Sequence, residues 1–107
     1  MSKIPRLSHL QFLVLGALRE GRRSGREMRE RIEAFGTRMS GPAFYQLMAR
    51  LEDAKLVEGT YHQQIVEGQI IRERHYKITA AGSRAWTRTS EFYLQVIREA
   101  GGSPIGA

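Results

Sequence analysis

Ser-Gly-Pro-Ala-Phe-Tyr-Gln-Leu-Met-Ala-Arg-Leu-Glu, residues 40–52, begins a segment that predicts an amphipathic helix from about residue 41 to residue 55. Ser40 is a favourable N-terminal cap, and a proline in the first turn of a helix loses no hydrogen bond. The apolar stripe of this helix is expected to pack on a core and contains Phe44, Leu47, Met48 and Leu51. The opposite face carries Tyr45, Gln46 and Ala49, with Arg50 at its edge.

The stretch that leads into this helix and forms most of it lacks negative charge, since no acidic residue occurs between Glu33 and Glu52. An apolar back and a small, hydrogen-bonding, acid-free front suit a helix that enters the major groove of DNA. We therefore expect double-stranded DNA as a partner.

The length of the chain indicates a single folded domain, and its composition favours an anionic partner. The chain has 107 residues and a formal net charge of +6, and 14 of its 17 basic residues are arginine. The planar guanidinium group suits phosphates and guanine edges, although a solvated basic surface gives the same composition. The chain contains no cysteine, which excludes disulfide bonds, a cysteine nucleophile and thiolate metal sites.

Several other classes of protein are disfavoured. The longest apolar run, Phe12–Leu15, is too short to span a membrane, and no secretory signal pattern is present, so we expect a cytoplasmic protein. The three histidines, His9, His62 and His75, share no metal-ligand spacing. No serine has a histidine and an acid arranged with it for nucleophilic catalysis. Together these observations lead us to expect no metal, no cofactor and no enzymatic activity.

Two helices are predicted before residue 40. Ser8 with Gln11, and Ser24 with Glu27, are capping-box pairs at the two helix starts. The first helix is apolar on two sides, because Phe12 and Leu15 lie opposite its main stripe. This second side is expected to contact a partner subunit. The charges of the second helix are interpreted as four-residue pairs on a solvated face.

A hairpin and a long helix are predicted after residue 55. Residues 56–61 and 70–79 have strand patterns, and the polar stretch 62–69 is expected to connect them with a turn at Glu67-Gly68. Thr79 can cap the last helix, residues 80–100, whose length of roughly 30 Å exceeds what the preceding helices can cover. Residues 101–107 are expected to form a flexible tail.

This order of elements predicts a mainly α (α+β) winged helix-turn-helix fold with a two-stranded β wing. Residues 1–79 would form the DNA-binding domain and residues 80–100 a C-terminal dimerisation helix.

Motifs along residues 7–82 occur in the order and spacing of a known family. They are Leu10–Leu18, Gly25-Arg26-Glu27-Met28, Ala43-Phe44-Tyr45, Arg50-Leu51-Glu52, Leu56-Val57 and Arg74–Gly82. In these segments the chain resembles the PadR-like transcriptional regulators. Arg26 stands where the family usually has tyrosine, and Gln46 stands where proline is common.

The resemblance implies a homodimeric repressor in which the last helix packs against the first helix of the other subunit. The two recognition helices would then lie about 34 Å apart, one turn of DNA. The residues expected at the dimer interface are Phe12, Leu15, Trp86, Tyr93, Val96 and Ile97. Trp86 and Tyr93, seven residues apart on one helix face, are interpreted as ordinary dimer core. The resemblance offers an alternative, because some members of the family bind a planar aromatic effector in such a place.

The residues expected to contact DNA lie on the third helix, before it and in the wing: Arg38, Ser40, Tyr45, Gln46, Arg50, Arg72 and Arg74. Gln46 and Tyr45 are placed to read bases, and the arginines and Ser40 to hold phosphates. Packing of Tyr45 on the second helix, and ion pairing of the wing arginines within the hairpin, remain alternatives. A winged helix that binds a protein or senses a small molecule without contacting DNA is the alternative function.

Overall fold

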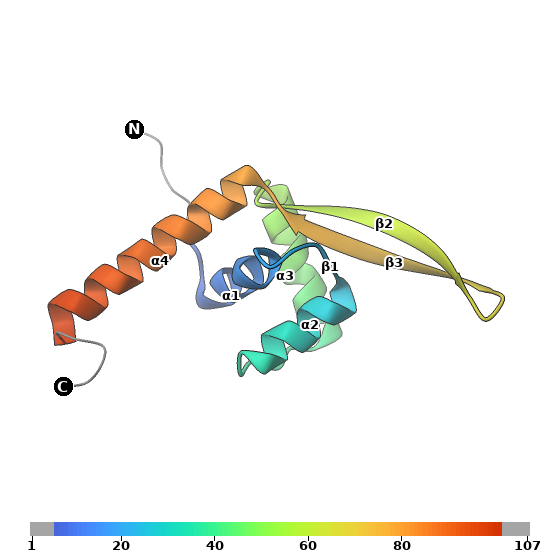
Figure 1. The fold of residues 1–107 in the computed structure, drawn as a ribbon, viewed down its shortest axis with the longest axis horizontal. Helices are drawn as coiled ribbons and strands as arrows, with labels where there is room; N and C mark the ends of the chain where they lie inside the picture. Colours follow the sequence, from blue (N-terminus) through green and yellow to red (C-terminus); the bar gives the residue numbers. More distant parts are fainter. Residues whose placement is uncertain (1–5, 102–107) are drawn as a thin grey trace.

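The structure, a computed structural model, describes residues 6–101. Its elements in chain order are α1 (His9–Leu18), β1 (Arg23–Ser24), α2 (Gly25–Ala34), α3 (Gly41–Asp53), β2 (Val57–Val66), β3 (Gln69–Ile78) and α4 (Ala80–Gly101). The first three helices pack together, while the β2–β3 hairpin and α4 extend from this body in opposite directions (Figure 1). Residue 101 ends α4, and the rest of the predicted tail lies outside the described residues.

The helix starts follow the predicted capping chemistry. Ser8 and Ser24 each form a complete capping box, with Gln11 and Glu27. The Ser40 hydroxyl accepts a hydrogen bond from the Ala43 backbone N–H. These caps place the start of each helix where the sequence predicts it.

The core lies between α1, α2, α3 and the base of the hairpin. Its largest fully buried side chains are Tyr76, Phe44, Leu15, Leu18, Met28, Ile32, Met48, Leu51 and Val14. The ring of Phe44 meets that of Tyr76 edge to face, with centroids 6.2 Å apart, so that α3 is anchored on β3. The apolar stripe of α3 thus holds the helix on the body and leaves its other side outward.

The sheet has three strands rather than two, in the order β1-β3-β2. The short β1 adds Arg23 opposite Tyr76 and Ser24 opposite His75. Two residues directly before a helix give no alternating pattern, which is why the sequence did not indicate this strand.

The wing is longer than predicted. β2 and β3 pair along ten residues each, and only Glu67 and Gly68 lie between them. Both of these residues have positive φ, 51° and 80°, as a tight hairpin turn requires. The prediction of a polar connection over residues 62–69 was therefore wrong, because polar side chains on both faces of a solvated ribbon hide the strand alternation.

The charged residues of α2 connect it to other elements instead of pairing along the helix as predicted. Arg31 donates two hydrogen bonds of 2.8 Å to Glu20 after α1. Arg26 pairs with Glu73 of β3 at 3.0 Å. These contacts link α2 to both neighbours.

The first half of α4 packs on α1 of the same chain. Trp86 stacks on Phe12 with ring centroids 5.3 Å apart, and Tyr93 meets Phe12 edge to face at 5.7 Å. Leu15, predicted at the dimer interface, is instead fully buried in the core of its own chain. The apolar side of α1 is thus covered largely from within, so Leu15 has no surface to offer a second subunit.

Beyond Tyr93, α4 leaves the body and every residue of the helix is exposed. Within residues 6–101, no helix is both long enough and apolar enough to cross a membrane.

Candidate nucleic-acid interface

The outward face of α3 is polar and solvent-exposed. Gln46, Ala49 and Arg50 are exposed, and Tyr45 keeps 49% of its surface accessible. Phe44, Met48 and Leu51 on the other side are fully buried. The helix therefore presents hydrogen-bonding groups to solvent over its length while its packing fixes their orientation.

Tyr45 lies beside the start of α2 and borders a cleft between α2, α3 and the wing. A Cβ atom on Gly25 would come within 2.9 Å of the Tyr45 hydroxyl oxygen, so glycine leaves room for this ring. The cleft encloses about 340 Å³ and is lined by Ser24, Gly25, Arg26, Tyr45, Tyr61, Arg72, Glu73 and Arg74. Tyr45 thus packs on α2 and still reaches solvent. Packing on α2, the alternative considered from the sequence, therefore leaves part of the ring exposed.

The two wing arginines have different surroundings. Arg74 pairs with Glu52 of α3, and the missing side chain of Gly59 leaves space for the pair. The hydrogen bond to Glu52 raises the pKa of Arg74, while burial raises the pKa of the neighbouring Tyr76 to about 12. Arg74 thus joins the wing to α3. An ion pair within the hairpin is the alternative that the sequence suggests, whereas the observed partner is Glu52 of α3.

Arg72 lies further out on the wing. Its guanidinium carbon is 4.2 Å from the ring centroid of Tyr61, and the side chain is exposed. Stacking on tyrosine holds the guanidinium plane without consuming its hydrogen-bond donors. Arg72 therefore keeps its donors for a phosphate, whereas Arg74 uses part of its set on Glu52.

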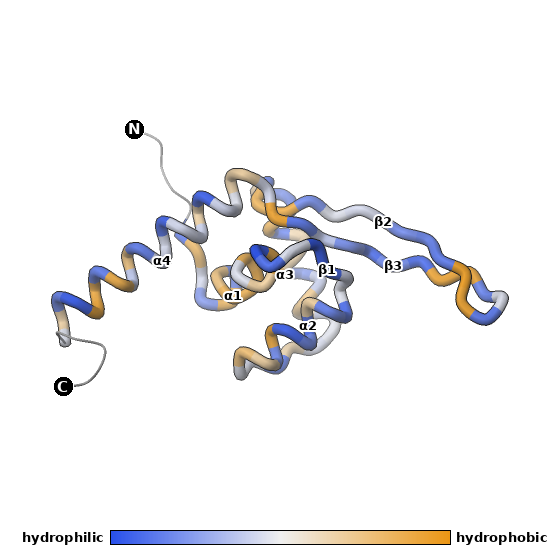
Figure 2. Tube along the Cα trace, in the orientation of Figure 1, coloured by the Kyte–Doolittle hydropathy of each residue, from blue (hydrophilic) through white to orange (hydrophobic). Residues whose placement is uncertain are grey.

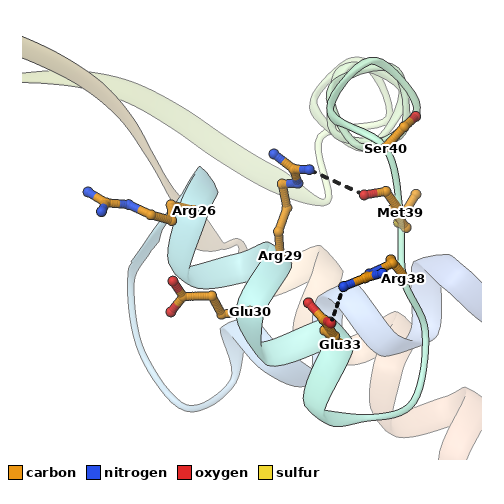
Figure 3. A pocket seen from close by; sticks show the side chains of 7 residues that line it. All are labelled: Arg26, Arg29, Glu30, Glu33, Arg38, Met39 and Ser40. Carbon is orange, nitrogen blue, oxygen red and sulfur yellow. Dashed lines mark hydrogen bonds and ion pairs between the residues drawn. The ribbon is translucent and has the colours of Figure 1, made fainter.

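Arg38 and Ser40 lie just before the first turn of α3 and line a second cleft of about 520 Å³. Figure 3 shows Arg29 reaching the Met39 carbonyl, at 3.3 Å, and Arg38 beside Glu33, also at 3.3 Å. The Arg38 side chain is 87% exposed, and an ion pair so open to water contributes little stability. Arg38 can therefore exchange Glu33 for a phosphate at little cost.

Sequence reasoning missed three residues that the fold brings to these clefts: Arg26, Arg29 and Tyr61. Arg26 and Arg29 were interpreted as part of a solvated helix face. The only sequence signal was the position of Arg26, where the resembling family usually has tyrosine. Tyr61 gave no signal, since its role depends on the hairpin register.

Two histidines face each other on the other side of the wing. The rings of His62 and His75 have centroids 4.4 Å apart. Desolvation lowers the pKa of His62 from its usual 6.5, and the charges of Arg22 and His75 lower it further. The folded protein therefore favours neutral His62.

Acidification is expected to destabilise the fold through His62. Below pH 6.5 the unfolded chain binds a proton at this residue more readily than the folded chain, so the free energy of unfolding falls as the pH drops. Between pH 7.5 and pH 5.5, the thermal midpoint should fall more for wild type than for the His62→Gln variant. Equal decreases in the two proteins would contradict this assignment.

The indole of Trp86 is largely covered within the chain. Its Nε1 lies 3.0 Å from the place of a Cβ on Gly16, and the guanidinium carbon of Arg19 lies 4.2 Å from the ring centroid. With Phe12 stacked on it as well, Trp86 has the surroundings of a packed residue.

The fold and the sequence were compared with known proteins. Residues 14–88 match the model of the transcriptional regulator PadR-like family. No curated protein matches the chain.

Solved structures share the fold at low sequence identity. A PadR family transcription regulator from Clostridium difficile superposes with a TM-score of 0.72 at 17% identity, covering 86% of this chain and 97% of that one. A transcriptional regulator from Clostridium thermocellum gives 0.69 at 21% identity, with 85% and 88% covered. RosR of H. salinarum gives 0.69 at 21% identity, with 87% and 79% covered.

The family model matches well over half of the chain, from the middle of α1, through α3 and the wing, into α4. The helix caps, the exposed polar face of α3 and the β2–β3 wing all lie within or beside this match. The chain therefore belongs to the PadR-like family of transcriptional regulators.

Proposed function

We propose that this transcriptional regulator is a homodimeric repressor that binds double-stranded DNA sequence-specifically, with α3 in the major groove. The observation that carries the proposal is the exposed face of α3, with Tyr45, Gln46, Ala49 and Arg50 and no acidic residue before Glu52, on a helix that is anchored by the fully buried Phe44, Met48 and Leu51. A rigid helix with small and hydrogen-bonding side chains fits the groove and reads base edges.

Phosphate contacts would flank the recognition helix on both sides. Arg38 and Ser40 lie before its first turn, and Arg72 lies on the wing beside it. Backbone donors at a helix start and exposed arginines are the usual ligands of the DNA backbone. Arg26 joins this set, because its pair with Glu73 leaves the side chain 75% exposed.

The exposed half of α4 supports the homodimer. Tyr93, Val96 and Ile97 each leave nearly half of their surface open to solvent, next to Phe92 and Leu94. A helix that carries such an apolar stripe away from its own core requires a partner to bury it. A second copy would supply this cover and place two α3 helices on one duplex.

Substitutions at Gln46 and Arg38 are expected to change DNA binding in different ways. Gln46→Ala should alter the preferred bases, because the side chain is placed at base edges. Arg38→Ala should weaken binding to all sequences similarly, by roughly 1 kcal/mol, since a phosphate contact carries no sequence information. Selection from a random duplex library, followed by anisotropy titrations, measures both effects.

Arg84→Ala, at an exposed position of α4, is the matched control for the loss of one arginine. If Gln46→Ala selects the same sequences as wild type and Arg38→Ala binds with unchanged affinity, the assignment of α3 to the groove is wrong.

Charge on the apolar stripe of α4 is expected to dissociate the dimer. Val96→Glu places a carboxylate where the partner helix would pack, and burying it without a partner charge costs several kcal/mol. Light scattering after size exclusion should give a monomer for Val96→Glu. Gln95→Glu is the control and should give a dimer, because Gln95 is the exposed polar residue next to Val96. A Val96→Glu dimer as stable as wild type would exclude this stripe as the interface.

A further inference from the structure

The two faces of the wing differ in charge. Because side chains alternate along a strand, cross-strand partners share a face. The face defined here as the cleft face contains Val57, Gly59, Tyr61, Gln63 and Ile65 with their partners Ile78, Tyr76, Arg74, Arg72 and Ile70. The other face contains Glu58, Thr60, His62, Gln64 and Val66 with Lys77, His75, Glu73, Ile71 and Gln69.

All acidic residues within the two strands lie on the other face. The cleft face has none, and it carries Arg72 and Arg74 beside the cleft that Tyr45 of α3 borders. Glu73 reaches the rim of that cleft, where Arg26 pairs with it at 3.0 Å. The cleft face is therefore the side of the ribbon that suits a polyanion next to α3.

The cleft face ends in an exposed apolar pair. Ile65 and Ile70 are directly opposite each other in the ladder and are 76% and 71% exposed. Figure 2 shows hydrophobic residues concentrated at this end of the hairpin. On the other face, Val66 is 43% exposed and Ile71 is partly covered. Two isoleucines so open to water indicate an unoccupied contact surface.

The outer part of the ribbon covers most of the distance between neighbouring DNA grooves. From Tyr61, beside α3, to Ile65 the strand advances four residues, or about 13 Å at 3.3 Å per residue. Half a turn of DNA, from a major groove to the neighbouring minor groove, is about 17 Å. Arg72 lies between these two points, where the ribbon would cross the phosphate backbone.

We propose that the Ile65–Ile70 pair enters the minor groove beside the recognition site and wedges between base pairs, so that the protein bends the DNA it binds. The inference rests on the proposed function. Apolar side chains inserted from the minor groove unstack a base step and kink the duplex toward the major groove.

The test measures bending separately from binding. A duplex of about 40 base pairs from upstream of the protein's own coding sequence carries a donor and an acceptor dye at its ends, and energy transfer reports the bend. Wild type should shorten the distance between the dyes. The double variant Ile65→Ala/Ile70→Ala should still bind and lose most of this shortening, whereas Val66→Ala, on the other face, should retain it.

A second probe places 2-aminopurine at successive positions flanking the site. Its fluorescence should rise at the wedged step with wild type and not with the double variant. Circular dichroism checks that both variants keep the hairpin, which is expected because the substituted side chains are exposed.

Binding by wild type without shortening, or equal shortening by the double variant, would overturn the wedge and leave the proposed function standing. Absence of binding to any duplex by folded wild type would overturn both. A change in oligomeric state of the double variant in light scattering would identify the pair as a contact between copies and likewise overturn the wedge.

Discussion

Gly82→Ala is expected to reduce the free energy of unfolding by about 3 kcal/mol, at the upper end of the usual cost of overpacking. Gly82 is buried in the first turn of α4, where a Cβ atom would collide with the backbone carbonyl oxygen of Leu56 and lie 2.8 Å from Cγ1 of Ile78. A backbone carbonyl cannot rotate away as a side chain does. Either α4 or the strand entry after α3 has to move.

Thermal unfolding at fixed protein concentration measures this effect. A loss of about 3 kcal/mol lowers the midpoint of a domain of this size by roughly 10–20 °C. Gly101→Ala in the same helix is the control, since a Cβ there meets nothing within 4 Å. A Gly82→Ala protein as stable as Gly101→Ala would contradict the close approach of α4 to the chain after α3.

Ala49→Glu is expected to weaken DNA binding by about 3 kcal/mol, a roughly hundredfold rise in Kd. Ala49 is exposed on α3, one turn beyond Gln46 on the same stripe. A carboxylate there would face the phosphates and base edges of the groove without a compensating cation. The fold should be kept, because alanine and glutamate both favour helices.

Thr87→Glu is the matched control, because it adds the same charge at an exposed position of α4. Anisotropy titrations of both variants with one duplex separate a local effect at α3 from a general loss of positive charge. Similar Kd values for the two variants would show that the outer face of α3 does not contact DNA.

Local patterns in the sequence predicted much of the fold. The capping boxes at Ser8 and Ser24, the apolar stripe of α3 and the turn at Glu67-Gly68 depend on neighbours within a few residues. Such short-range chemistry can be recognised without knowing the fold. It also predicted which side of α3 is buried and which side is open.

Features that depend on the tertiary arrangement could not be predicted in this way. The two-residue β1 exists only because β3 passes beside it, and Arg74 pairs with Glu52 only because the hairpin returns to α3. Leu15 was misplaced for the same reason, since helical periodicity gives the side of a helix but not what covers it. The contacts of each candidate residue with DNA stay predictions.

The binding of α3 and the flanking arginines to DNA is tested most directly by a salt titration of the wild-type protein on upstream duplex DNA, with a random duplex alongside. Arg26, Arg38, Arg50 and Arg72 from each of two subunits would make eight phosphate contacts, which predict a slope of roughly −7 for log K against log salt concentration. The upstream duplex should remain the tighter ligand throughout. Absence of binding by an intact dimer at low salt, or a slope near zero, would contradict the account.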